Sequence, residues 1–157
     1  MAVANAIQFP SALFSEITRE VVDRRGAEGA DMLYAAGLAF GESVIGALRT
    51  EGVAATALFG LALERASGWG FGALSASGEG EIPKEVDVAS SAANAWSASP
   101  DGGPQCHILR GVLAGFAQRI ARRPVDVVET ACAGAGGATC KFKINLDVAP
   151  TEDSWSW

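Results

Sequence analysis

Four side chains in the C-terminal half of the chain have types and spacing that suit metal binding. Glu129 precedes Cys132 by three residues, and Cys140 follows after seven residues that are all alanine, glycine or threonine. Cys106 lies upstream of them. Three thiols and one carboxylate form a complete four-ligand set of the kind that zinc takes in closed sites. The alternative is that the cysteines are small buried hydrophobic residues, as isolated cysteines usually are.

The elements expected around these residues would turn them toward the core. In the strand VDVVETA, period-two alternation puts Glu129 on the same face as two valines, and in TCKFKINL it puts Cys140 on the same face as Phe142. Cys106 begins the helix CHILRGVLAGFAQRIARR, whose apolar stripe also faces inward. The three thiols and the carboxylate could therefore converge, which would give a buried carboxylate the partner it needs.

Helices are expected in the first half of the chain and strands in the second. Helical periodicity and stop signals predict helices at residues 9–25, 29–49 and 53–66. Gly26 is the predicted stop of the first helix. Alternation and turn residues predict strands at 68–77, 85–92, 125–131 and 139–146, with a loop at 97–105 and the remaining helix at 106–123.

Composition limits the classes of function. We expect one domain at residues 1–150, with residues 151–157 as a flexible tail. A net charge of −6 argues against nucleic acid and anionic membranes as partners. The longest apolar run, VAATALFGLAL, has 11 residues, too few for a membrane span. An odd number of cysteines without an export signal indicates a reducing, cytoplasmic location.

Glycines recur four residues apart on two of the predicted helices. Gly37 and Gly41 form one pair, and Gly111 and Gly115 form the other. Such spacing aligns bare backbone on one face and permits close approach of a second helix. Tight packing within the domain and a helix-mediated homodimer or cavity wall both explain it. We expect a homodimer through the N-terminal glycine-bearing helices.

The run CHILRGVLAGFAQRIARRPVDVVETACAGAGGATCKFKI resembles the C-terminal half of the 4-vinyl reductase-type (hydrocarbon-binding) domain. The pattern of that family is a cysteine, a G-x-x-x-G helix, a strand ending in E-x-x-C, a glycine-bearing loop and C-x-F. The matching residues here are Cys106, Gly111, Gly115, Glu129, Cys132, Cys140 and Phe142. YAAGLAFGE and SGWGFGAL agree more loosely, so the resemblance covers roughly residues 27–147.

The resemblance implies an α+β fold: an antiparallel sheet of about four strands with helices packed on it and a helical N-terminal half, as in transport-particle tethering subunits. Sensor domains of phenol- and toluene-responsive activators belong to the family and bind small aromatic molecules in a buried pocket. A zinc ion held by three cysteines and one glutamate stiffens that region. Those ligands correspond to Cys106, Glu129, Cys132 and Cys140. The ATPase and DNA-binding domains of the sensors, and the histidine and tryptophan that hold phenol, have no counterpart here.

Five residues are candidates for contacting a small apolar or aromatic ligand: Tyr34, Trp69, Phe71, Trp96 and His107. Large flat side chains opposite alanine and glycine would leave a cavity that suits such a ligand. The alternative for the aromatic residues is ordinary core packing. For His107, the only histidine, it is a hydrogen bond to a carbonyl group or an acid.

Two classes of function are compatible with this pattern. The first is a zinc-containing binding domain without catalysis, and the second is an enzyme or accessory factor in the reduction of a (bacterio)chlorophyll vinyl group. Vinyl reduction needs an electron source, and the sequence shows neither a dinucleotide fingerprint nor a second cysteine cluster. The single histidine has no evident nucleophile to activate. We therefore expect a binding domain rather than an enzyme.

Overall fold

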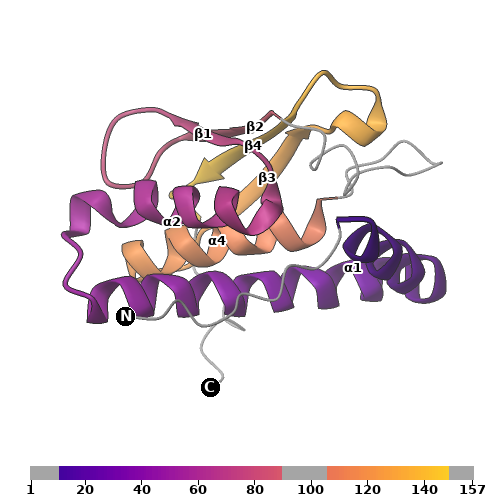
Figure 1. The fold of residues 1–157 in the computed structure, drawn as a ribbon, viewed down its shortest axis with the longest axis horizontal. Coiled ribbons are helices and arrows are strands. Elements are labelled where there is room, and N and C mark those ends of the chain that lie inside the picture. Colours follow the sequence, from indigo (N-terminus) through magenta and orange to yellow (C-terminus); the bar gives the residue numbers. More distant parts are fainter. Residues whose placement is uncertain (1–10, 90–105, 149–157) are drawn as a thin grey trace.

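The computed structural model describes residues 11–89 and 106–148, which form an α+β fold (Figure 1). The helices are α1 (Ser11–Thr50), α2 (Leu58–Ala66) and α4 (His107–Ala121). The strands are β1 (Leu74–Ser77), β2 (Glu85–Val88), β3 (Asp126–Ala131) and β4 (Cys140–Asn145). Short helical turns cover Ala55–Ala57, Ser67–Phe71 and Ala133–Ala135. The expected fold class, with its helical N-terminal half, is confirmed.

The strands form one antiparallel sheet in the order β1-β2-β4-β3. In Figure 1, α2 and α4 lie between this sheet and α1. Along β4, Cys140, Phe142 and Ile144 are buried while Lys141 and Lys143 are exposed. This is the predicted alternation, and it places Cys140 on the side of the sheet that faces the core.

The glycines of α1 and α4 let these helices touch backbone to backbone. A Cβ atom on Gly37 would lie 2.2 Å from the carbonyl oxygen of Ile108, and one on Gly111 would lie 2.1 Å from that of Tyr34. No real Cβ atom could occupy either position. The paired glycines therefore set how closely α4 approaches α1.

The prediction that Gly37 and Gly41 form a dimer surface is wrong for these two residues. Both are buried, and a Cβ atom on Gly41 would lie 2.3 Å from the carbonyl oxygen of Val112. The helix α4 of the same chain already occupies this face of α1. Tight packing within the domain, the other interpretation of the spacing, is what the structure supports.

The helices predicted at residues 9–25 and 29–49 are joined into one long element, α1, with a break at Gly26. This residue has φ 55° and ψ −131°, which is not helical. Glycine adopts such angles without the steric cost that a Cβ atom brings. The break lies where the sequence predicted a stop, but a new helix follows it directly.

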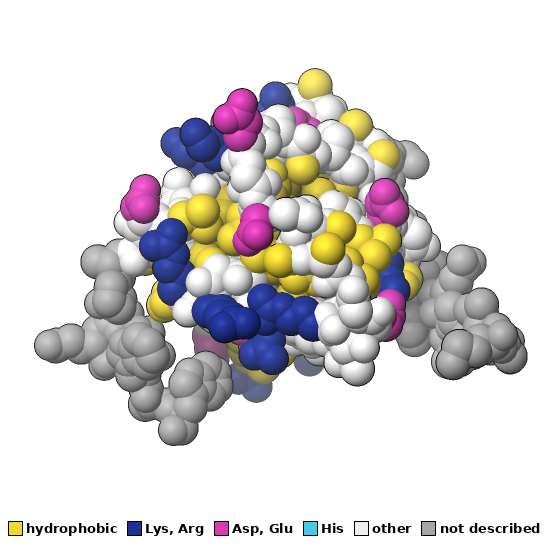
Figure 2. Space-filling view, turned by 90° about the vertical axis from the view of Figure 1, so that its left-hand side faces the viewer, with side chains coloured by type: hydrophobic (Ala, Val, Ile, Leu, Met, Phe, Trp, Pro, Cys, Tyr) yellow, Lys and Arg dark blue, Asp and Glu magenta, His cyan; other side chains and the backbone are white. Residues whose placement is uncertain are grey.

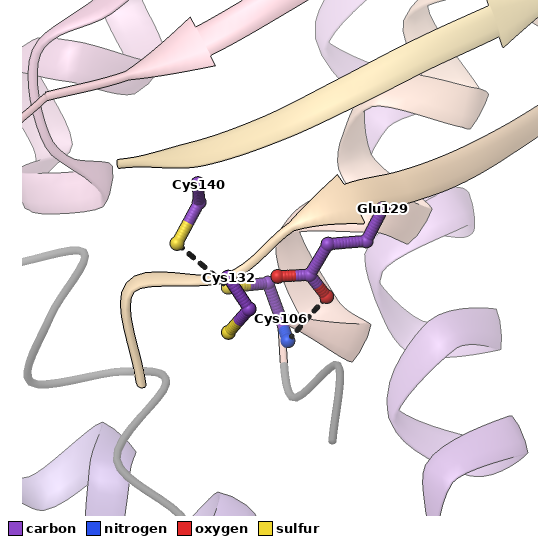
Figure 3. A group of neighbouring side chains, drawn as sticks. All are labelled: Cys106, Glu129, Cys132 and Cys140. Atoms are coloured by element: carbon purple, nitrogen blue, oxygen red, sulfur yellow. Dashed lines mark hydrogen bonds between the residues drawn. The ribbon is translucent and has the colours of Figure 1, made fainter. Parts of the chain in front are cut away.

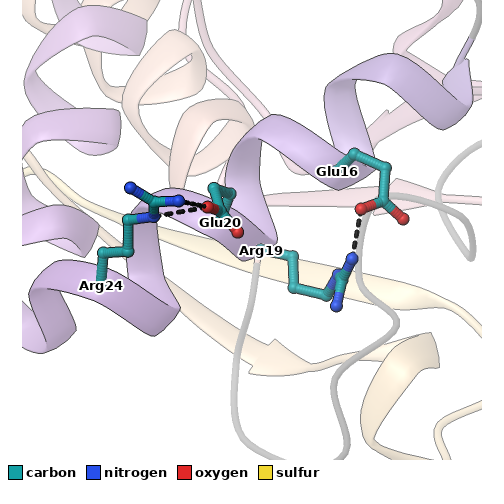
Figure 4. Close-up of polar contacts among 4 residues, drawn as sticks. All are labelled: Glu16, Arg19, Glu20 and Arg24. Atoms are coloured by element: carbon teal, nitrogen blue, oxygen red, sulfur yellow. Dashed lines mark hydrogen bonds and ion pairs between the residues drawn. The ribbon is translucent and has the colours of Figure 1, made fainter.

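The first turns of α1 carry charged pairs on their exposed surface. Glu16 pairs with Arg19, and Glu20 pairs with Arg24, at helical spacings of three and four residues (Figure 4). Exposed pairs of this kind contribute at most about 1 kcal/mol each. They favour a solvated helix over a charge-binding site in this part of the molecule.

The strand predicted at residues 68–77 is wrong over its first half. Ser67–Phe71 extends α2 as a π-helical turn, and β1 begins only at Leu74. Gly70 and Gly72 have φ angles of 95° and 102°, which are outside the strand region. Trp69 and Phe71 therefore do not share the face of a strand.

One helix of the described part of the chain, at residues 15–50, is long and apolar enough to cross a membrane by length and composition. A third of its best window is buried inside the fold, and the core helix of a non-membrane protein passes the same test. This is weak evidence for a span. The face of the molecule in Figure 2 shows a group of basic side chains beside an apolar band, with separate acidic residues. The ends of α1 and α4, with Arg49 and Arg119 in their last turns, lie on that side.

Candidate metal centre

Four side chains converge beside the start of α4, as the sequence predicted: Cys106, Glu129, Cys132 and Cys140 (Figure 3). One donor atom from each lies within 4.8 Å of the donor atoms of the others. The three cysteines are buried, and none of them forms a disulfide. Residues from α4, β3 and β4 therefore meet at one point.

Strand pairing places two of these residues. Cys140 is the first residue of β4 and pairs with Val88 of β2, while Glu129 of β3 pairs with Phe142. The register of β3 and β4 shifts between Glu129 and Ala131. Such a bulge redirects the residues that follow it, and the next residue after β3 is Cys132.

The loop of small residues folds back on Cys132. The N–H groups of Ala135 and Gly137 donate to the carbonyl oxygen of Cys132 at 3.1 and 2.9 Å. A Cβ atom on Gly137 would lie 2.8 Å from that same oxygen. The N–H of Ala133 donates to Sγ of Cys140 at 3.3 Å. This contact needs the close return of the chain that the glycines allow.

The two carboxylate oxygens of Glu129 have different surroundings. Oε2 accepts a hydrogen bond from the backbone N–H of Cys106 at 3.1 Å. Oε1 is buried and has no hydrogen-bond partner among the described residues. A buried oxygen in this state is costly. A cation held between it and the sulfur atoms would remove that cost.

The surroundings of Cys106 oppose its ionisation. Its pKa is raised, first by the hydrogen bond to Sγ of Cys140 at 3.6 Å, then by burial and by the Glu129 carboxylate. The thiol of Cys132 raises it further. Because the thiolate is the form that binds metal, a bound cation would have to supply the charge that the protein does not.

This donor set fits a metal ion. Three of the four donors are sulfur atoms, and the fourth is the carboxylate whose Oε1 lacks a partner among the described residues. Thiolates favour zinc, copper(I) or iron over magnesium and calcium. The cluster is therefore a candidate metal centre that would join α4 to β3 and β4.

A depression of about 280 Å³ lies on the outer side of this cluster. It is lined by Glu129, Thr130, Ala131, Cys132, Ala135 and Gly137. Two of the four donor residues thus border a space that reaches the surface, whereas Cys106 and Cys140 do not line it. Nothing in the sequence indicated this asymmetry.

Two of the predicted ligand residues lie at the crossing of α1 and α4, next to a residue that the sequence did not single out. The guanidinium of Arg110 stacks over the ring of Tyr34, 4.7 Å from its centroid. Arg110 Nε is buried without a hydrogen-bond partner among the described residues. His107, one helical turn before Arg110, is half-buried. Burial and the Arg110 charge lower the pKa of His107, and burial raises the pKa of Tyr34.

The other predicted ligand residues lie elsewhere. Trp69 is 47% exposed and meets Phe40 edge to face, with ring centroids 5.4 Å apart. Phe71 packs against the hydrophobic core, and Trp96 lies outside the described residues. Tyr34 and Phe40 are six residues apart on α1, so they face different sides of the helix. The predicted ligand residues are thus not gathered at one place.

Comparison with known families supports the resemblance seen in the sequence. Residues 90–146 match the family model of the vinyl-4-reductase domain, which confirms the recognition of the 4-vinyl reductase-type domain in this part of the chain. An uncharacterized protein of Methanocaldococcus jannaschii is 37% identical over 51 residues. The match covers 32% of this chain and 32% of that protein.

Three solved structures share the fold. The phenol-responsive sensory domain of the transcription activator PoxR, solved with phenol, has a TM-score of 0.75 at 16% identity, over 89% of this chain and 76% of that one. A vinyl-4-reductase family protein from Methanocaldococcus jannaschii has a TM-score of 0.59 at 18% identity, over 90% and 83%. Trafficking protein particle complex subunit 3 from Naegleria fowleri, covalently bound to palmitic acid, has a TM-score of 0.62 at 15% identity, over 90% and 98%.

Proposed function

We propose that this chain is a small-molecule-binding domain that contains a structural zinc ion and takes an apolar or aromatic ligand. The family match and the fold shared with a phenol-responsive sensory domain support the binding function. The zinc ion is supported by one observation above all. Four donors converge where Oε1 of Glu129 is buried without a partner among the described residues.

The zinc ion would be held by the four converging residues. When bound, zinc keeps coordinating thiols deprotonated and contributes its binding energy to folding. The ligands come from the residue before α4, from β3 and the loop after it, and from the start of β4. A site closed by four protein ligands leaves no open position for a substrate, so the role we propose for the metal is structural.

We place the ligand beside the first turn of α4, which the metal centre would hold in position. Tyr34 and His107 are both half-buried there, and Arg110 covers the Tyr34 ring. The stacked ring and guanidinium offer a flat surface to an aromatic molecule. His107 offers a hydrogen-bonding group to a ligand hydroxyl.

Two measurements on freshly purified protein test this function. Elemental analysis should give one zinc ion per chain, and native mass spectrometry should detect a small molecule that co-purifies. Calorimetry against phenols, fatty acids and a chlorophyllide precursor should then show binding of an apolar or aromatic compound. Uptake of none of them would contradict the binding function. Turnover of a vinyl tetrapyrrole with added reductant would replace it with the enzymatic one.

A further inference from the structure

Cys132 is the cysteine of the cluster that solvent can approach. It lines the depression of about 280 Å³ beside the metal centre, and Cys106 and Cys140 do not. A water molecule takes about 30 Å³ in the liquid, so the space admits a small hydroperoxide. Reactivity of a thiolate depends on its ionisation and on access. Among three sulfur atoms that zinc would hold as thiolates, access singles out Cys132.

A second thiol lies within reach of Cys132. The donor atoms of the cluster are all within 4.8 Å of one another, and a disulfide needs its sulfur atoms about 2 Å apart. The sulfur atoms would therefore have to approach by at most about 3 Å. Cys132 lies at the start of the loop that contains Gly136 and Gly137. The chain there carries no large side chain that would oppose the movement.

We propose that Cys132 is an oxidation site for hydroperoxides, and that Cys106 or Cys140 converts the oxidised residue to a disulfide with release of the metal ion. This inference rests on the zinc centre proposed above. It adds a chemical modification that the proposed binding function does not require. The site would respond to small hydroperoxides, because the depression limits the size of the oxidant.

The chemistry balances in two steps. The Cys132 thiolate attacks one oxygen of the hydroperoxide, the O–O bond breaks, and the leaving alkoxide or hydroxide takes a proton from water. The sulfenic acid formed on Cys132 is then attacked by the neighbouring thiolate. The S–O bond breaks, the S–S bond forms and hydroxide leaves. Two thiolates lose two electrons in total, and the hydroperoxide is reduced to an alcohol or to water.

Loss of two thiolates explains why the metal would leave. A disulfide sulfur carries no negative charge and is a poor ligand. Only one thiolate and Glu129 would then remain, and two donors do not complete a zinc site. Reduction of the disulfide would restore all four donors and the site.

The test uses zinc-loaded full-length chain and hydrogen peroxide. Metal content is measured first, and zinc release is then followed with a coloured chelator while a sulfenic-acid-specific reagent traps the first product. Peptide mapping assigns the modified residues. We expect the trapped sulfenic acid on Cys132, a disulfide from Cys132 to one of its neighbours, stoichiometric zinc release, and recovery after treatment with reductant and zinc.

Two matched variants test the role of the depression. Ala135 lines it, and Ala138 is an exposed residue of the same loop that does not. Ala135→Leu should slow oxidation of Cys132 severalfold while zinc stays bound, and Ala138→Leu should leave the rate unchanged. Neither residue supplies a metal ligand, so both variants should load zinc fully.

Several results would overturn the inference. Oxidation that joins Cys106 to Cys140 and spares Cys132 would show that access does not select the thiol. Equal rates in Ala135→Leu, Ala138→Leu and the original chain would exclude the depression as the route. A zinc-loaded chain that resists peroxide refutes this inference alone. A chain that never contains zinc refutes the metal centre, and with it the proposed release.

Discussion

Glu129 is the residue at which burial and charge bear most directly on function. Its Oε2 fixes the start of α4 through the Cys106 N–H, while its buried Oε1 has no partner in the described part of the chain. The same carboxylate contributes to the raised pKa of Cys106. One metal ion would correct all of these imbalances, so substitutions in the cluster should act through metal binding.

Cys140→Ser should abolish stoichiometric zinc binding and lower the melting temperature. Cys140 is fully buried and lies 3.6 Å from the Cys106 sulfur, so a hydroxyl there replaces a soft ligand by a hard, neutral one. Elemental analysis and thermal denaturation measure the two effects. Thr130→Ala, a change on the exposed surface of β3, is the control and should keep zinc. A Cys140→Ser protein with full zinc would contradict the ligand assignment.

At the ligand site, His107→Ala and Tyr34→Phe should weaken the binding of a phenol more than Trp69→Ala does. His107 and Tyr34 are half-buried beside Arg110, whereas Trp69 packs on Phe40 near the surface. Loss of one hydrogen bond to a ligand hydroxyl costs about 1 kcal/mol, or roughly fivefold in affinity. Calorimetry with phenol compares the three variants. A larger loss in Trp69→Ala would place the pocket near α2 instead.

Among the elements, the contact of α1 with α4 has the strictest geometry. Glycines on both helices remove the side chains that would hold the backbones apart. In addition, Gln118 Nε2 donates to Glu42 Oε1 across the helix pair at 3.1 Å. The position of α4 matters for function because its first residues carry Cys106 and His107.

Gly41→Ala should destabilise the protein by about 3 kcal/mol or more, because the new Cβ atom would overlap the backbone of α4. Gly46→Ala is the matched control. It lies in the same helix, where a Cβ atom meets nothing within 4 Å. That change should stabilise the protein by about 1 kcal/mol through helix propensity. Denaturant unfolding measures both, and equal effects of the two changes would refute the close packing.

For the whole molecule, the metal centre is the point where distant parts of the chain are joined. The four ligands span residues 106 to 140 and belong to three elements and the loop after β3. Removal of zinc by a chelator should therefore lower the stability of the whole fold rather than of one loop. At a free zinc concentration about a thousand times the dissociation constant, the expected loss is about 4 kcal/mol. Calorimetric scans with and without chelator test this, and an unchanged melting temperature would count against a structural role.

Assembly and location stay predictions. The glycine face that suggested a homodimer is covered by α4, but Phe40 and Trp69 are exposed by 43% and 47% and touch each other. If a homodimer forms there, Phe40→Ser with Trp69→Ser should give monomers in sedimentation velocity without loss of zinc. Glu64→Ser, on the exposed surface of α2, is the control. A monomeric original chain at micromolar concentration would end the dimer prediction. The cytoplasmic location follows only from the cysteine count.

The sequence by itself determined the metal cluster and most of the sheet. Alternation along β3 and β4 is a local property of the backbone, so it assigned Glu129 and Cys140 to the core side without tertiary information. The glycine-rich loop and the cysteine before the helix did the same for Cys132 and Cys106. These inferences succeeded because each depends on residues close together in the chain.

Tertiary structure decided what depends on contacts between distant segments. Glycine spacing marks a face for close approach but cannot say which helix approaches, and only the fold shows that α4 fills it. The aromatic residues of SGWGF suggested a strand, yet positive φ angles at Gly70 and Gly72 make a helical turn and move Trp69 to the surface. Arg110 had no local signal, because its stacking on Tyr34 joins residues 76 positions apart in sequence. The access of solvent to Cys132 was likewise invisible in the sequence, since it depends on how β3 and its loop fold around the cluster.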